Sequence, residues 1–128
     1  MRTPPKPRGA DGFATVFAAL HGILAKHEAL MRVVHDAPGN YHLDAGYSEK
    51  WKRDIFFGGV RANKDYVSFY LMPVYMHPEL LNRISPGLKA RMQGKSCFNF
   101  TAVEPTLFQE LTVLTKQGLE RFKKEGLV

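Results

Sequence analysis

Two histidines and two aspartates flank a turn in the first third of the chain. His35 and Asp36 precede the Pro-Gly-Asn turn at 38–40, and His42 and Asp44 follow it. Such a turn between two short apolar runs predicts a β-hairpin, whose simple register would bring the four side chains close together. Imidazole nitrogens and carboxylate oxygens are ordinary metal ligands. The four residues are therefore the candidate metal ligands, although solvated hairpin side chains give the same pattern.

Other residues with chemical potential carry weaker signals. Cys97 has no histidine beside it in the sequence, which favours a structural thiol over a nucleophile. Trp51 lies within the basic stretch 50–53. Basic-aromatic clusters of this kind stack bases or hold phosphates, and a tryptophan that anchors a loop on the core gives the same pattern. The glycine pair at 58–59 lacks a phosphate-loop pattern around it and indicates a strand bulge or a close approach of the backbone.

The composition is that of an ordinary globular protein. The chain has 128 residues, of which 45% are hydrophobic and 12% aromatic, enough for one domain with its own core. The single cysteine excludes an internal disulfide and fits a reducing compartment. The sequence shows no N-terminal apolar stretch of signal-peptide or membrane-spanning length. We therefore expect a cytoplasmic protein that has no membrane partner.

The positive charge is unevenly distributed. The net charge is +6, and residues 77–101 carry four basic residues against one acidic residue, a net charge of +3. The Pro-rich stretch 1–12 carries three basic residues against one acidic residue. Such an excess attracts an anionic partner, and it is also what a solvated basic surface looks like.

Apolar periodicity predicts an α+β domain at 13–128, preceded by a flexible basic arm at 1–12. Long helices are expected at 12–30 and 104–124, and short helices that begin at Pro78 and Ser85. About five antiparallel strands are expected, at 30–37, 41–45, 54–60, 66–72 and 96–101. The short helices would be inserted before the last strand.

The strand at 66–72 is the most apolar of these. Val67, Phe69 and Leu71 must face the core, because alternate side chains of a strand point to the same face. The opposite face would carry Tyr66, Ser68, Tyr70 and Met72, an amphipathic set whose two tyrosines and methionine would form part of an exposed patch. An exposed aromatic patch marks a contact surface, whereas a loop or the N-terminal arm would bury it. The sequence leaves both alternatives open.

This central region resembles the YdhG-like family of small bacterial proteins, a domain of unknown function. The resemblance rests on the stretch YVSFYLMPVY at 66–75 and on SPGLKARMQGKSCFNF at 85–100. The family pattern is a basic, glycine-containing turn that leads into a Phe-bearing strand, matched here by Lys89, Arg91, Gly94, Lys95, Phe98 and Phe100. The resemblance implies a frataxin-like arrangement of helix, antiparallel sheet and helix.

Some YdhG-like proteins are regarded as frataxin-like iron chaperones for iron–sulfur and haem assembly. Frataxins carry an acidic ridge on the first helix and strand. Here those segments offer only Asp11, Glu28 and Asp36 as carboxylates, and the chain is basic. The resemblance therefore implies the fold more strongly than the activity.

Three functions follow from these observations. The first is a non-enzymatic binding protein for an anionic small molecule or protein partner, with nucleic acid a less expected partner and with no cofactor. Its candidate residues are Tyr66, Tyr70, Met72, Lys89, Arg91 and Lys95. The second is an iron chaperone that uses the four residues His35, Asp36, His42 and Asp44. The third is a small enzyme whose site the sequence does not reveal.

Overall fold

A computed structural model describes residues 9–128, with side chains described from residue 13 onward. The chain forms one antiparallel sheet, covered on one face by two long helices, α1 (Gly9–Ala25) and α4 (Pro105–Lys124). The strands are β1 (Arg32–Ala37), β2 (Asn40–Ser48), β3 (Arg53–Ala62), β4 (Val67–Leu71) and β5 (Cys97–Phe100), and they lie in sequence order across the sheet. The predicted α+β class with five antiparallel strands is confirmed.

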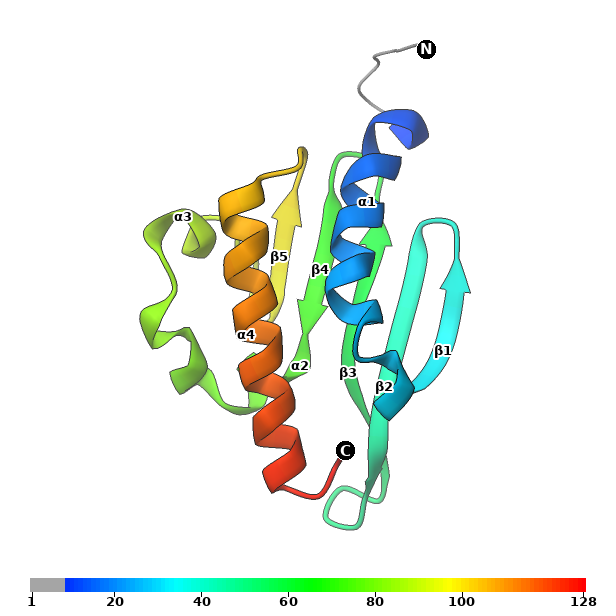
Figure 1. Ribbon diagram of the computed structural model, residues 1–128, viewed down its shortest axis with the longest axis vertical. Helices are drawn as coiled ribbons and strands as arrows, with labels where there is room; N and C mark the ends of the chain where they lie inside the picture. The colour runs from blue at the N-terminus through cyan, green and yellow to red at the C-terminus, as the bar shows by residue number, and fades with distance from the viewer. Residues whose placement is uncertain (1–8) are drawn as a thin grey trace.

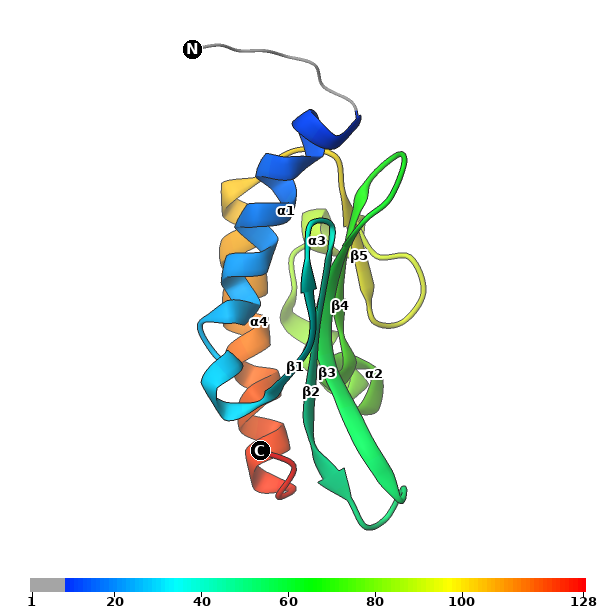
Figure 2. The same cartoon turned by 90° about the vertical axis from the view of Figure 1, so that its right-hand side faces the viewer.

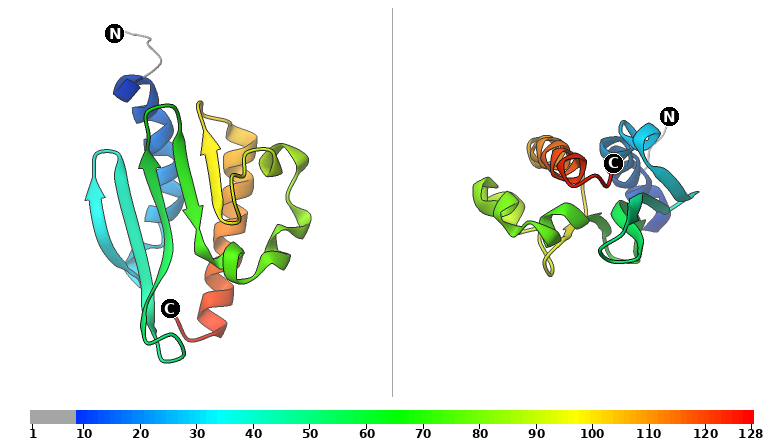
Figure 3. Two further views of the ribbon diagram at one scale, coloured as in Figure 1. Left: turned by 180° about the vertical axis from the view of Figure 1, so that it is seen from behind. Right: turned by 90° about the horizontal axis from the view of Figure 1, so that it is seen from below.

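The long helices lie side by side on the same side of the sheet (Figure 2). Seen from behind, the sheet lies in front of both helices, and no long helix covers its other face (Figure 3, left). The core therefore sits in a single layer between the sheet and the helices. Phe57 of β3 meets Phe122 of α4 edge to face, with ring centroids 5.5 Å apart.

Helix α1 differs from the prediction at both ends. It begins at Gly9, so the last part of the predicted arm, 9–12, belongs to the helix; residues 1–8 lie outside the described residues. It ends at Ala25, and a separate 3-10 turn η1 (Glu28–Leu30) follows. Leu30 is half exposed and does not continue the apolar stripe. Strand β1 consequently starts at Arg32, later than expected.

The two glycines of β3 mark a place of close packing. Leu43 of β2 pairs with Gly58, whereas Asp44 pairs with Phe56, so Phe57 is the extra residue of a bulge. The predicted bulge is thus confirmed next to the glycine pair. A Cβ on Gly58 would lie 3.1 Å from Leu24 of α1 and 2.9 Å from the Tyr70 carbonyl oxygen. The missing side chain lets α1 lie directly on the sheet.

Strand β4 is the centre of the core, as its pattern predicts. Val67, Phe69 and Leu71 have no solvent-exposed surface. The strand ends at Leu71, so Met72 is not its last residue: it begins the short helix α2 (Met72–Met76). Pro73 explains this correction, because its fixed φ suits the first turn of a helix and its nitrogen cannot donate to a strand ladder.

Two further short helices lead to β5, as expected. The 3-10 helix η2 (Pro78–Arg83) begins at the predicted proline. Helix α3 (Pro86–Lys89) is capped by Ser85, whose hydroxyl oxygen accepts a hydrogen bond from the Leu88 N–H at 3.2 Å. Helix α3 is a single turn that ends at Lys89. These helices carry the chain along the outer edge of β5 (Figure 1).

A glycine in α4 allows this helix to approach α2. Gly118 is buried, and a Cβ at this position would lie 2.7 Å and 2.9 Å from two carbons of the rigid Pro73 ring. Gly22, on the exposed side of α1, would meet nothing within 4 Å. The two positions therefore form a matched pair of helical glycines, one packed and one free.

We predict opposite effects of alanine at these two positions. Gly22→Ala should raise the free energy of unfolding by up to about 1 kcal/mol, because alanine favours the helix. Gly118→Ala should lower it by about 1–3 kcal/mol, because overpacking outweighs that gain. Urea denaturation followed by circular dichroism measures both changes. Equal stabilisation by the two substitutions would show that α4 does not pack on Pro73.

Candidate functional site on the open sheet face

The pairing register builds a polar row across the face of the sheet that the helices leave uncovered. Asn40, Arg61, Ser68 and Asn99 lie opposite one another on β2, β3, β4 and β5. Ser68 alternates with Val67 and Phe69, which face the helices, so the whole row points to the opposite side. The row is fixed by the same alternation that fills the core.

Side-chain hydrogen bonds hold this row in place. The Ser68 hydroxyl donates to Asn99 Oδ1 at 2.6 Å and accepts from Asn63 Nδ2 at 3.0 Å. Asn99 Nδ2 donates to Gln93 Oε1 at 2.6 Å. Although Ser68 is almost fully buried, its polar atom is therefore satisfied. Arg61, which lies between Asn40 and Ser68 in the row, is exposed and has no ion-pair partner among the described residues.

The three residues expected on the outer face of the central strand are only partly exposed. Tyr70 lies on the open face, opposite Cys97 of β5 and Gly59 of β3. Tyr66 precedes β4 and is partly buried. Met72 belongs to α2, where it packs against the core. They do not form the fully exposed aromatic patch that was one of the two alternatives.

The predicted basic segment is divided by its surroundings. Lys89 is exposed at the end of α3, beyond the edge of the sheet. Arg91 pairs with Glu104, with Nη2 and Oε2 2.7 Å apart, and so has a structural partner. Lys95 is exposed in the turn before β5, and the segment that enters β5 runs on the side of the sheet away from the helices (Figure 2). Of the three, Lys95 is best placed to act with Arg61.

Arg61 was missed by the sequence reasoning. The alternation of side chains near the end of β3 could have identified it, because Val60 faces the core and the next residue, Arg61, must then face outward. The bulge next to the glycine pair hides this alternation, since it shifts the inward and outward positions by one residue along β3.

The candidate metal ligands divide between the two faces. His35 and His42 lie opposite each other on the open face, with ring centroids 5.9 Å apart, and His42 Nε2 lies 2.8 Å from Asp44 Oδ1. Asp36 pairs with the core residue Tyr41 and contacts His21 of α1 at 3.3 Å. The simple register therefore could not bring all four together, because the adjacent His35 and Asp36 point to opposite faces.

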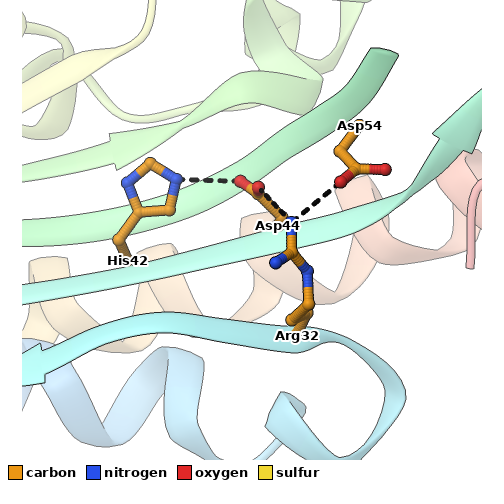
Figure 4. Close-up of polar contacts among 4 residues, drawn as sticks. All are labelled: Arg32, His42, Asp44 and Asp54. Carbon is orange, nitrogen blue, oxygen red and sulfur yellow. Dashed lines mark hydrogen bonds and ion pairs between the residues drawn. The ribbon is translucent and has the colours of Figure 1, made fainter.

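Asp44, the candidate metal-binding carboxylate on the open face, already contacts an arginine. Arg32 Nη2 lies 3.4 Å from Asp44 Oδ2 and 2.8 Å from Asp54 Oδ2, so it bridges the two carboxylates (Figure 4). Between residues 9 and 128, no three His, Cys, Asp or Glu side chains are grouped so as to hold a metal ion. The arrangement ties β1, β2 and β3 together, and an arginine takes the place that a cation would need.

Cys97 is a partly buried thiol on the open face. Burial raises the pKa of this thiol above its ordinary value, while hydrogen bonds with Ser68 and Tyr70 act in the opposite direction. The thiol also contacts Asn99 Oδ1 at 3.3 Å. A raised pKa lowers the thiolate fraction at neutral pH, which favours the predicted structural thiol over a nucleophile.

Comparisons with protein-family models, with curated proteins and with solved structures find no match to this chain. The family resemblance therefore stays a prediction. Among the helices of residues 9–128, none has the length and apolar character needed to span a bilayer.

The environment of Cys97 predicts slow alkylation. Iodoacetamide should modify the folded chain several-fold more slowly at pH 8 than the urea-unfolded chain, because the folded thiol has the higher pKa and less exposed surface. The rate in the folded chain should also rise at higher pH than in the unfolded chain. Mass spectrometry of quenched time points measures both. Faster reaction of the folded chain would reveal an activated cysteine.

Proposed function

We propose that the chain is a non-enzymatic binding protein that docks an acidic protein partner on the open face of its sheet. We also propose that its fold is frataxin-like and YdhG-like and that it acts in the cytoplasm. The order helix, five-stranded antiparallel sheet, helix supports the proposal on the fold. The single cysteine supports a reducing compartment.

One observation carries the proposed function. The polar row Asn40, Arg61, Ser68 and Asn99 crosses a face that no long helix covers. Arg61 is exposed there, and Lys95 is exposed in the turn before β5; neither has an ion-pair partner in the described chain, whereas Asp44 and Asp54 share Arg32. An acidic surface would complement these two unoccupied cations.

The shape of the face favours a macromolecule over a small ligand. Small-molecule sites are concave, and four hollows on the described chain are lined by residues outside the polar row. Nucleic acid is less favoured, because its binding draws on many phosphate contacts and this face offers few free cations. A row of side-chain amides, a hydroxyl and a guanidinium matches the polar chemistry of a protein interface rim.

The alternatives draw less support from the geometry. An iron chaperone needs several hard oxygen ligands, and the open-face carboxylates are bridged by Arg32. An enzyme needs an activated group, and burial raises the pKa of the Cys97 thiol, which disfavours its reactive thiolate form. No observation in residues 9–128 favours either function over binding.

A paired charge variant tests the proposal. Arg61→Gln with Lys95→Gln should elute from immobilised poly-L-glutamate at clearly lower salt than the unmodified chain, because both cations face the ligand. The control, Lys26→Gln with Lys116→Gln, removes the same charge from exposed positions on the helix side and should shift elution much less. Circular dichroism confirms that each variant is folded.

Two results would overturn the proposal. Equal shifts for both double variants would show that retention follows net charge and not this face. Retention on single-stranded oligothymidine at higher salt than on polyglutamate, lost specifically with Arg61→Gln and Lys95→Gln, would assign the face to nucleic acid.

A further inference from the structure

Two aromatic side chains stand exposed together at the end of the sheet where β2 turns into β3. Trp51 lies in that turn and is 54% exposed, and Tyr75 lies in α2 and is 53% exposed. Trp51 therefore does not anchor its loop on the core, which was the alternative for this residue. Because both side chains line the same hollows, they form a shared aromatic surface, and such surfaces tend to mark contact sites.

Trp51 and Tyr75 line the same two hollows in the surface. The larger, of about 550 Å³, is lined by Ser48, Lys50, Trp51, Tyr75, Met76, His77, Glu125 and Leu127. The smaller, of about 270 Å³, is lined by Trp51, Arg53, Asp54, Ile55, Phe56, Met72, Tyr75 and Met76. Trp51, Tyr75 and Met76 line both, so they form the ridge between them. The larger volume falls within the roughly 300–1,000 Å³ of small-molecule sites.

Among the described residues, each hollow is lined by one basic side chain that has no ion-pair partner. Asp54 is held by Arg32 at 2.8 Å, and Glu125 Oε2 lies 2.9 Å from His77 Nε2. Lys50 borders the larger hollow and Arg53 the smaller, and neither has an ion-pair partner in the described part of the chain. Each lining carboxylate thus has a contact partner within the chain, whereas Lys50 and Arg53 have no ion-pair partner among the described residues.

The cation of the larger hollow already lies over an aromatic ring. Lys50 Nζ is 5.3 Å from the centroid of the Trp51 ring, within the range of a cation–π contact. A ring that stacks on Trp51 would therefore place its substituents near an ammonium group. Ser48 lines the same hollow. Its hydroxyl oxygen accepts a hydrogen bond from the backbone N–H of Trp51 at 3.2 Å, which leaves the hydroxyl proton free to donate.

We propose that these hollows bind a small aromatic phosphate of the size of a nucleoside monophosphate. The ring stacks on Trp51 and Tyr75, and the phosphate pairs with Lys50 and accepts from the Ser48 hydroxyl. Arg53, in the adjoining hollow, adds positive charge. This site shares none of its ligand-binding residues with the polar row, so it stands or falls independently of the proposed protein-binding face.

The single tryptophan of the chain provides a direct readout, because its fluorescence reports on this site alone. Titration with adenosine 5′-monophosphate should quench it. Adenosine, which lacks the charge, and ribose 5-phosphate, which lacks the ring, should each bind at least about tenfold more weakly, since stacking and charge pairing each contribute roughly 1–3 kcal/mol.

Matched variants locate the interaction. Tyr75→Ala and Lys50→Gln should each weaken adenosine 5′-monophosphate binding by about tenfold. The controls are Tyr47→Ala, an equally exposed tyrosine that lines neither hollow, and Lys116→Gln on α4. Both controls should leave the affinity unchanged. Thermal melting checks that each variant folds, which is expected because the substituted side chains are exposed.

Three results would overturn this proposal. The first is no quenching up to about millimolar ligand, a binding free energy of about −4 kcal/mol. The second is equal affinity for adenosine and its monophosphate, which would leave only non-specific stacking. The third is weakening by Tyr47→Ala as large as that by Tyr75→Ala, which would place the contact outside the hollows.

Discussion

The packing of both long helices on one face of the sheet is the constraint on which the rest of the structure depends. Phe57 against Phe122, and the missing side chains at Gly58 and Gly118, let α1 and α4 lie close to the strands and to α2. With one core layer between helices and sheet, every strand must point its apolar residues to the same side. The polarity of the other side then follows from strand alternation.

That other side is ordered without being covered. Ser68 is almost fully buried on it because neighbouring side chains close around its hydrogen bonds. Arg32 likewise fixes the carboxylates of β2 and β3, because it contacts both Asp44 and Asp54. The face is thus a fixed surface, and fixed surfaces lose less entropy when a partner binds. Arg61 and Lys95 are cations that have no ion-pair partner in the part of the chain that the structure describes.

The class of fold, the order of its elements and the inward set of β4 could be read from the sequence, because apolar periodicity and turn residues act locally. Proline placement predicted η2 and α3, whereas the role of Pro73 in starting a helix was missed. Metal-site reasoning failed at Asp36 because closeness in sequence was taken as closeness in space, and neighbouring strand residues face apart.

The hollows beside Trp51 lay beyond sequence reasoning for a different reason. The basic stretch around the tryptophan was visible, but its aromatic counterpart Tyr75 comes from α2, on a distant part of the chain. Only tertiary packing brings them together. The same holds for the ion pair between Arg91 and Glu104, which removes one cation from the predicted basic segment.

We propose that the binding surfaces are those that the two helices leave uncovered, and hydroxyl-radical footprinting of the dilute, folded chain shows whether these surfaces are open to solvent. Trp51 and Tyr75 should be oxidised rapidly, Tyr70 at an intermediate rate, and Tyr41 and Phe57 hardly at all. Protection of Trp51 and Tyr75 to the level of Tyr41 would contradict the account, because it would mean that this end of the molecule is already buried.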